Sequence, residues 1–346
     1  MLLASLASEP DKHGSFWDHR QRIKTSNNDF FHVDYKYHSR DGTTSSKGLV
    51  VIVHGLQSNS NSSLSVDMGR AYIRQGFDCA CINFRGCSGV PNAGLRAYHL
   101  GFTDDLKQYL SLLNSGVEKP PPIFVSGFSL GANVVLKAWG ELGMSAYEDY
   151  NVYGAAVCGA PFENERNVNC VQKAGFNKLV YNGSLLKSLK TTALNQLERY
   201  PDSEEAQLLC YDEIANSEEI SAFENAVIAP LFGFEDNIDY YRKTDCVQFL
   251  DRIRVPTIVI NAADDPFFDP NFFPFDKGCT SKEGREKRSA VRLVRTKYGG
   301  HLGYMFHQRE DDTREQEGRD EVSFMPGELS RFIQHVWERR TSLMKR

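Results

Sequence analysis

The stretch that decides the fold is Pro122-Ile123-Phe124-Val125-Ser126-Gly127-Phe128-Ser129-Leu130-Gly131, followed by helix-forming residues over 132–139. An apolar run leads into a Gly-x-Ser-x-Gly pentapeptide, in the order that a nucleophile elbow requires. A serine on so tight a strand-to-helix turn needs neighbours without bulky side chains, and Gly127 and Gly131 meet that need. The stretch therefore predicts Ser129 at the tip of an elbow. Glycine and serine also occur in ordinary turns, so other features of the chain are needed to identify this one as a nucleophile elbow.

Composition favours a soluble globular protein. Hydrophobic residues make up 41% of the 346, and the mean hydropathy is -0.44. No run approaches the eighteen or more apolar residues of a membrane span, and the apolar start, Met1–Ala7, lacks the basic lead of a signal peptide. The net charge of -5 argues against a nucleic-acid partner. Three of the eight cysteines lie in apolar runs and no C-x-x-C pair occurs, so we expect reduced thiols and a cytoplasmic protein.

Strand-like and helical segments alternate along most of the chain, which predicts an α/β fold with a mostly parallel sheet between helices. The expected strands are 49–53, 77–84, 122–125, 152–158, 257–260 and 291–294, and the expected helices are 64–75, 103–114, 131–142 and 327–344.

The alternation stops between about Pro161 and Asp251, where helix formers dominate and no convincing strand occurs. This interruption predicts a core formed by residues 1–160 and 252–346, with residues 161–251 as a helical cap. A pair of ordinary crossover helices is the alternative. Two charged segments, 277–288 and 309–321, are expected to be solvated loops.

A serine hydroxyl becomes a nucleophile only when a base removes its proton, and in this architecture the chain order is Ser, acid, His. Two histidines follow the elbow and precede the last expected helix, namely His301 and His307. His301 follows Gly299 and Gly300 just beyond the last expected strand, where glycines let a loop return over the sheet. We therefore expect His301 to be the base.

The acid is expected in Asn261-Ala262-Ala263-Asp264-Asp265-Pro266, directly after the strand at 257–260. A strand-end turn usually places the acid three residues past its first turn residue, which favours Asp264. Asp265, before proline, is the competing carboxylate and is expected to cap or brace the loop. An Asx-rich turn without a catalytic part is the other interpretation.

Acyl transfer also needs donors for the oxyanion. The segment His54-Gly55-Leu56 follows the central strand, so we expect the backbone N–H groups of Leu56 and Leu130 to form the pair. His54 is expected to brace this loop. No metal-ligand spacing and no glycine-rich dinucleotide loop appear, so neither a metal nor a cofactor is expected.

Two other patterns leave alternatives open. His99 and Asp104 have the H-x4-D spacing that pairs a base with a carboxylate in unrelated acyltransferases, although Thr103-Asp104-Asp105 also reads as a helix start. The phenylalanines at 267, 268, 272, 273 and 275 either line an acyl-chain pocket, dock on lipid, or pack beneath the cap.

Specific runs spread over most of the chain resemble the YheT, or embryogenesis-associated, branch of the α/β-hydrolases, which is related to the abhydrolase-domain lipases. The matching runs are His54-Gly55-Leu56, Asn83-Phe84-Arg85-Gly86-Cys87-Ser88-Gly89, Tyr98-His99, Gly127 to Asn133, Ala229 to Phe234, Asn261 to Pro266 and Gly299 to Gly303. The resemblance implies the triad Ser129, Asp264 and His301, acting on carboxylic esters of lipids or acylglycerols. It also implies that His99 is present without being the base of the serine.

The sequence thus predicts a serine esterase or lipase that works through an acyl-enzyme. Two rivals remain, an acyltransferase to an acceptor other than water and a binding protein that kept the fold. The expected partner is a small-molecule or lipid ester. Contact with a membrane surface is left open.

Overall fold

The computed structural model describes residues 8–9, 16–39, 44–172, 183–278, 290–304 and 324–344. The predictions for His307 and for segment 309–321 lie outside the described residues, as does all but the start of segment 277–288.

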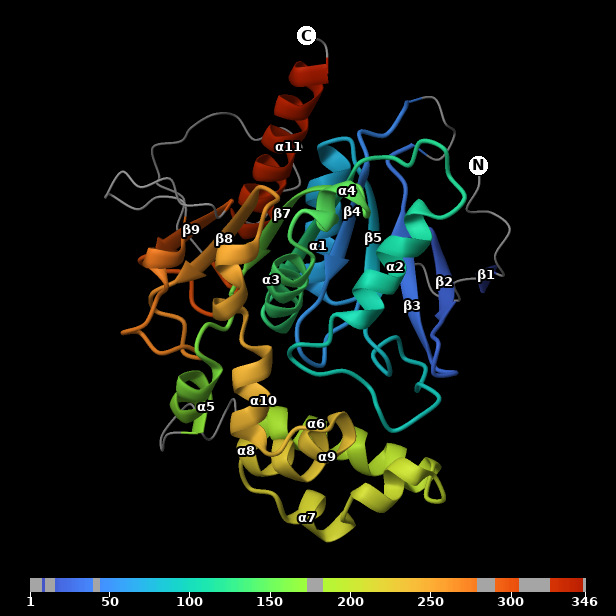
Figure 1. The fold of residues 1–346 in the computed structure, drawn as a ribbon, viewed down its shortest axis with the longest axis vertical. Helices are drawn as coiled ribbons and strands as arrows, with labels where there is room; N and C mark the ends of the chain where they lie inside the picture. Colours follow the sequence, from blue (N-terminus) through green and yellow to red (C-terminus); the bar gives the residue numbers. More distant parts are fainter. Residues whose placement is uncertain are drawn as a thin grey trace.

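A nine-stranded sheet forms the centre of the molecule (Figure 1). Its strand order is β1-β2-β3-β5-β4-β6-β7-β8-β9, in which the pairs from β5 to β9 are parallel and those of β1, β2 and β3 are antiparallel. Every residue of β4 and β6 is buried, as expected for apolar strands covered on both faces. The strands are β1 (Ser8–Glu9), β2 (His19–Lys24), β3 (Phe30–Lys36), β4 (Leu49–Val53), β5 (Asp78–Asn83), β6 (Ile123–Phe128), β7 (Val152–Cys158), β8 (Thr257–Ala262) and β9 (Val291–Thr296).

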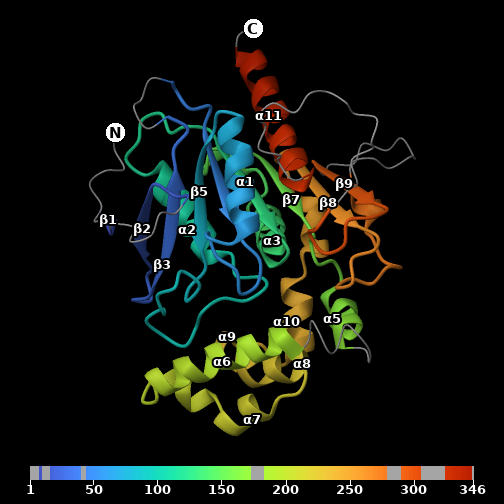
Figure 2. The ribbon, with the colours of Figure 1, turned by 180° about the vertical axis from the view of Figure 1, so that it is seen from behind.

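Helices cover both faces of the sheet and bury a separate apolar cluster on each. One face packs against α2 (Asp104–Asn114), α3 (Leu130–Leu142) and the short helix η4 (Cys246–Arg252). The other packs against α1 (Ser63–Arg74) and α11 (Phe324–Met344), which lie in front in Figure 2. The short helices α4 (Ser145–Glu148) and η5 (Phe275–Lys277) complete this part of the chain. The mostly parallel sheet and the predicted order of elements are confirmed.

The expected elements agree with the observed ones to within three residues at each end. Strand β6 continues from Ile123 through Phe128 to the serine itself, three residues beyond its expected end. Strand β8 continues to Ala262, two residues beyond its expected end. The antiparallel pair β2 and β3 is not among the expected strands.

Between β7 and β8 the described chain contains only helices, which form a lobe beyond the carboxyl ends of the parallel strands (Figure 1). The lobe has its own apolar cluster, which includes Leu186, Ile214, Phe223 and Leu231. Its helices are α5 (Asn164–Gln172), α6 (Gly183–Arg199), η2 (Glu204–Leu208), α7 (Tyr211–Asn216), α8 (Ile220–Phe223), η3 (Glu224–Ile228), α9 (Ala229–Phe232) and α10 (Asn237–Thr244).

The return of the chain from the lobe to the core is fixed by Asn133, one turn into the elbow helix α3. Its fully buried amide donates to Leu100 O and to Thr244 O, each at 2.9 Å, and accepts from Cys246 N at 3.0 Å. Cys246 and Leu250 already belong to the apolar cluster of the sheet. We therefore propose that the cap ends with α10, a few residues before the boundary at 251 that the sequence suggests.

A second polar link joins the lobe to the loop after β5. Gln196 on α6 donates to Asn92 Oδ1 at 3.0 Å and to Gly94 O at 2.9 Å. Asn92 in turn donates to Asp29 Oδ2 at 2.9 Å, at the start of β3. These side chains are at least nine-tenths buried, so each hydrogen bond is shielded from water and helps to hold the lobe in one position.

The elbow glycines are required because backbone approaches backbone at this point. A Cβ on Gly131 would lie 2.2 Å from Val53 O and 2.5 Å from His54 O, and one on Gly127 would lie 2.7 Å from Gly131 O. Real Cβ contacts are longer than 3.0 Å, so an alanine here would push α3 away from β4.

We predict that Gly131→Ala lowers the free energy of unfolding by about 1–3 kcal/mol or more, as expected for a forced clash in a packed core. Urea unfolding followed by circular dichroism measures this. Gly94→Ala is the matched control, because a Cβ at Gly94 meets nothing within 4 Å. Equal stability of the two variants would contradict the close packing of the elbow.

Candidate active site

Ser129 lies at the tip of a strained turn between β6 and α3. Its φ of 55° and ψ of -124° fall in a region that residues other than glycine seldom adopt. Its backbone N–H donates to Cys158 O at 2.9 Å, at the end of the neighbouring strand β7. The turn is therefore held by the sheet, and it carries the serine hydroxyl into the space between core and lobe.

His301 reaches the serine from a compact turn after β9. The distance between Ser129 Oγ and His301 Nε2 is 3.1 Å. Gly300 has a φ of 55°, and Tyr304 N donates to Gly299 O at 2.8 Å, which closes the turn on which His301 lies. The ring of Phe267 covers the imidazole at 4.2 Å between centroids. The structure therefore brings together the two residues that the sequence singled out first.

The carboxylate that contacts His301 is Asp265, so the sequence-based choice of Asp264 is wrong. Asp265 Oδ2 lies 2.8 Å from His301 Nδ1, and its side chain is only 1% exposed. Asp264 is exposed, and its Oδ1 accepts from Gly300 N at 2.8 Å. Asp264 thus fixes the start of the histidine turn, while Asp265 fixes the imidazole.

The error has a physical cause in the length of β8. The sequence-based count took Asn261 as the first turn residue, but Asn261 and Ala262 still pair with Arg295 and Thr296 of β9. Asn261 also bonds Ala160 in both directions, donating to its O at 2.8 Å and accepting from its N at 3.0 Å. The turn therefore starts later than the count assumed, so the count does not locate the acid, and Asp265 is the residue that faces His301.

The loop after β4 lies directly against the nucleophile. A Cβ on Gly55 would be 3.3 Å from Ser129 Cβ. His54 is fully buried. Its Nδ1 lies 2.7 Å from Gly55 O, and its Nε2 accepts a hydrogen bond from Phe84 N at 3.2 Å. Burial lowers the pKa of His54 to about 4, so the ring stays neutral. His54 braces the loop, as the sequence suggests.

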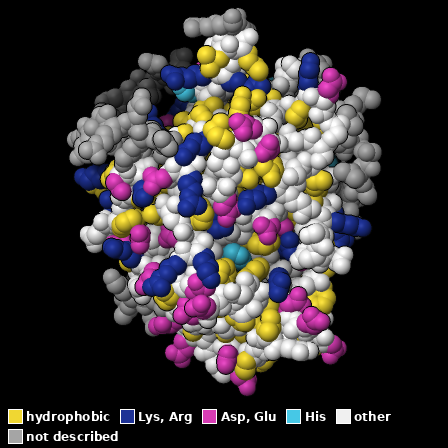
Figure 3. Space-filling view, in the orientation of Figure 1, with side chains coloured by type: hydrophobic (Ala, Val, Ile, Leu, Met, Phe, Trp, Pro, Cys, Tyr) yellow, Lys and Arg dark blue, Asp and Glu magenta, His cyan; other side chains and the backbone are white. Residues whose placement is uncertain are grey.

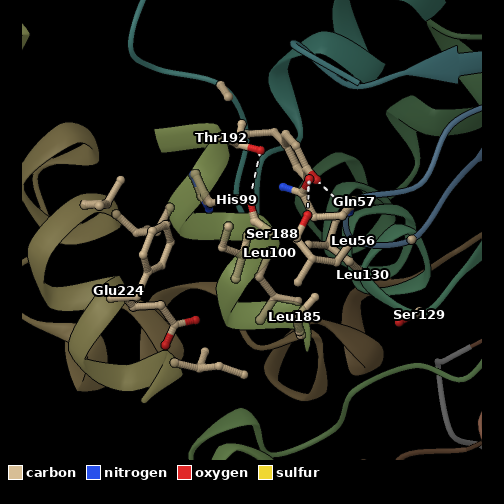
Figure 4. A pocket seen from close by; sticks show the side chains of 18 of the residues that line it. Leu56, Gln57, His99, Leu100, Ser129, Leu130, Leu185, Ser188, Thr192 and Glu224 are labelled. Carbon is tan, nitrogen blue, oxygen red and sulfur yellow. Dashed lines mark hydrogen bonds between the residues drawn. The ribbon is translucent and has the colours of Figure 1, made fainter. Parts of the chain in front are cut away.

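A pocket of about 1000 Å³ extends from the serine into the lobe. Figure 4 shows Ser129 on one side of it and Glu224 on the other, with Leu56, Leu100, Leu130 and Leu185 between them. On α6, Ser188 donates to Gln57 Oε1 at 3.3 Å and so joins the lobe to the loop after β4. The pocket wall is mostly apolar, and its volume lies at the upper end of the range for small-molecule pockets.

The five phenylalanines after the acid divide into three groups. Phe267 and Phe268 line the pocket and contact the imidazole of His301, at 4.2 and 5.5 Å between centroids. Phe272 and Phe273 pack against the apolar cluster of the sheet. Phe275 is 54% exposed. The pocket-lining and packing interpretations therefore each hold for different members of the group.

The H-x4-D pair is not joined in the structure. His99 lies in the pocket wall among the rings of Phe102, Phe232, Phe234 and Tyr240, and its Nδ1 accepts from Gly101 N at 3.2 Å. Burial lowers its pKa to about 3. Asp104 lies on the exposed side of α2, and among the described residues no hydrogen bond connects it to His99. This pair does not form a base and its carboxylate.

Residues 44–272 match the family described as serine aminopeptidase, S33. This chain belongs to that family of α/β-hydrolases. "Putative esterase YheT" of Escherichia coli is 31% identical over 304 residues, which are 88% of this chain and 83% of that protein. Phospholipase ABHD3 of Mus musculus is 24% identical over 81% of this chain and 62% of its own length. The resemblance to the YheT branch is therefore confirmed.

Solved structures support the same fold at low sequence identity. Esterase Pf2001 of Pyrococcus furiosus superposes with a TM-score of 0.54 at 15% identity, over 97% of this chain and 93% of that one. A 2,6-dihydroxy-pseudo-oxynicotine hydrolase superposes with a TM-score of 0.52 at 14% identity, over 92% of this chain and 67% of that one. These likenesses establish the α/β-hydrolase fold.

Sequence reasoning did not assign a role to several polar side chains that position the site. Asn133 and Asn261 hold the elbow helix and the acid loop, and Arg85 forms a bidentate pair with Asp105, with N–O distances of 2.9 and 2.6 Å. Asn133, Asn261 and Arg85 lie in the runs that carry the family resemblance. An asparagine or arginine within an otherwise apolar run is the signal for such a buried partner, but its partner lies too far along the chain to be identified.

The two adjacent aspartates allow a matched test. Asp265→Asn keeps the shape but removes the charge beside His301 Nδ1, so we predict a loss of about 10³–10⁴-fold in kcat for any ester that the protein turns over. Asp264→Asn retains an oxygen for Gly300 N and should change kcat less than about fivefold. Steady-state kinetics of both variants measures the difference. A larger effect of Asp264→Asn would contradict the assignment of Asp265.

Proposed function

We propose that this protein is a serine hydrolase of carboxylic esters, with Ser129 as nucleophile, His301 as base and Asp265 as the acid that orients the base. The observation that carries the proposal is the continuous chain from Ser129 Oγ to His301 Nε2 and from His301 Nδ1 to Asp265 Oδ2, at 3.1 and 2.8 Å. These distances suit proton transfer, and the chain opens into a mostly apolar pocket.

The reaction follows from the tautomer that this geometry favours. In this tautomer the ring proton of His301 stays on Nδ1, which donates a hydrogen bond to Asp265. Nε2 is then free to accept the hydroxyl proton of Ser129 as Oγ attacks the ester carbonyl. The tetrahedral intermediate collapses when His301 returns that proton to the leaving alcohol, which leaves an acyl-serine. Water then attacks the acyl group with His301 again as base, and the acid product departs.

The negative oxygen of the tetrahedral intermediate needs donors, and we propose the N–H groups of Leu56 and Leu130. Leu130 is the first residue of α3, where N–H groups have no acceptor within the helix. Leu56 follows Gly55, whose backbone lies against Ser129 Cβ. Both residues line the pocket beside the serine (Figure 4).

Esters of lipids or acylglycerols are the proposed substrates. The leucines and phenylalanines of the pocket wall can cover an alkyl chain, and the volume of about 1000 Å³ leaves room for one. Relatives of 22% and 24% identity are named monoacylglycerol lipase in Saccharomyces cerevisiae and phospholipase ABHD3 in Mus musculus.

The lobe has an acidic surface, which affects any contact with a membrane that contains the substrate. Residues 183–244 contain twelve Asp and Glu against five Lys and Arg, and acidic side chains gather over the lower end of the molecule in Figure 3. An acidic surface is repelled by anionic lipid headgroups. No described helix is long and apolar enough to cross a membrane. Contact with a membrane surface stays a prediction.

The two rival functions give different products and labels. An acyltransferase would also form the acyl-serine but would pass the acyl group to an added alcohol or lysolipid, which product analysis detects. A binding protein that kept the fold would not react with a fluorophosphonate probe.

We predict that Ser129→Ala abolishes labelling by a fluorophosphonate probe and lowers kcat for p-nitrophenyl esters by about 10⁴–10⁶-fold, because no other group replaces the nucleophile. Gel fluorescence and absorbance assays measure the two effects. Ser111→Ala, at an exposed position of α2, is the control and should retain both activities. Turnover that survives in Ser129→Ala would overturn the proposal.

A further inference from the structure

A carboxyl group that has no cationic partner among the described residues lies in the pocket wall, far from the nucleophile. Glu224 lines the pocket, and Figure 4 shows its carboxyl group on the opposite side from Ser129. Its Oε2 accepts a short hydrogen bond from the hydroxyl of Tyr241 on α10. The chain from Ser129 through His301 to Asp265 does not involve this group, which is half-buried, and even partial burial is unfavourable for a carboxylate that lacks a cationic partner among the described residues. Its position therefore calls for an explanation.

The helical backbone is irregular at Glu224. Residues 224–228 form a π-helical turn, in which Ala229 N donates to Glu224 O, five residues earlier. The turn precedes Pro230, whose missing N–H and ring disrupt regular α-helical bonding. One extra residue per turn changes the direction of the following side chains, and such insertions recur at functional sites.

The neighbouring polar groups are uncharged. Burial raises the pKa of Glu224 to about 8, with the Tyr241 hydrogen bond opposing the shift, so the carboxyl group is largely protonated at neutral pH. His99 in the same wall has its pKa lowered to about 3 by burial and is neutral. Arg85 also lines the pocket, but its guanidinium is paired with Asp105. Among the other described residues of the pocket wall, Tyr240, Tyr241 and Cys87 have pKa values raised by burial and are neutral as well.

We infer that Glu224, with Tyr241 and His99, forms a distal subsite that binds an uncharged hydrogen-bonding group of the substrate, such as a hydroxyl, held across an apolar spacer from the ester. This inference rests on the proposed esterase function and adds to it a class of substrate. A carboxylic acid offers a donor and an acceptor to a hydroxyl, and the neutral imidazole of His99, whose Nδ1 accepts from Gly101 N, offers its Nε2–H as a donor. A methyl group at the same place would give no hydrogen bond to the carboxyl oxygen that Tyr241 does not bond.

The experiment compares esters that differ only at the far end. p-Nitrophenyl esters of straight-chain acids and of the matching ω-hydroxy acids, in a series of chain lengths, place a methyl or a hydroxyl group at graded distances. A parallel series carries the hydroxyl on the alcohol side. The two series distinguish whether the acyl or the alcohol part reaches Glu224.

We predict that the wild-type protein prefers the ω-hydroxy ester at one range of chain lengths, about 3–10-fold in kcat/KM. Glu224→Leu should remove this preference, and Glu224→Gln, which keeps a neutral donor and acceptor, should retain most of it. The exposed Glu213→Gln on α7 is the matched control. An unchanged preference in Glu224→Leu, or a preference for an ω-trimethylammonium ester, would overturn the inference.

A second measurement does not depend on turnover. Between about pH 4.5 and 8, folded Glu224 binds more protons than unfolded Glu224, so its contribution to the free energy of unfolding falls as pH rises. The melting temperature of Glu224→Gln relative to wild type should therefore increase with pH over this window. The control Glu213→Gln should show no such trend. A difference that does not vary with pH would mean that Glu224 is ionised in the folded protein, against the inference.

The outcomes also separate the inference from the proposed function. If no ester is hydrolysed, binding of the free ω-hydroxy and straight-chain acids to the Ser129→Ala protein by calorimetry still reports the distal subsite. Equal binding of the two acids, with Glu224→Leu no different, would reject the subsite independently of catalysis.

Discussion

The close contact of the elbow with the ends of the two neighbouring strands, β4 and β7, is the constraint on which the site depends. Ser129 donates its N–H to Cys158 O at the end of β7, while Gly131 touches the backbone of Val53 at the end of β4. Such contacts hold the serine at a φ of 55° that it would not adopt in a free chain. They also bring the loops after β4, β6 and β7 to one edge of the sheet, where the chain can place a base and its acid.

Patterns that depend on neighbouring residues could be predicted from the sequence, and contacts between distant residues could not. The apolar runs of β4 and β7 gave their ends correctly because strands buried on both faces have continuous apolar sequences. β3 was missed because it buries polar residues. Its Asp34 is paired with Arg20 at 2.7 Å, and that partner lies on the neighbouring strand β2. No local period reveals such a pair.

The candidate site shows the same division at the scale of single residues. His301 could be identified because two glycines and the last strand define its loop. The choice between Asp264 and Asp265 required the end of β8 to within one residue, and Asn261 extends that strand by bonding Ala160, about a hundred positions earlier. A side chain that bonds a distant backbone thus decided which carboxylate faces inward. The helical cap was predictable in composition, while its attachment through Asn133 and Gln196 was not.

Burial has opposite effects on the pKa values of the acid and the base at the end of the pocket away from Ser129. Desolvation raises the pKa of an acid and lowers that of a base, so Glu224 and His99 shift in opposite directions and both become uncharged near pH 7. A wall built from such groups keeps hydrogen-bonding capacity without an electric charge. It penalises an ionic headgroup, which would have to leave water without a counter-ion. It accepts a hydroxyl, whose smaller desolvation cost a single neutral partner can offset. We therefore propose that the lobe discriminates by polarity at one end of the pocket, while Ser129, His301 and Asp265 lie at the other.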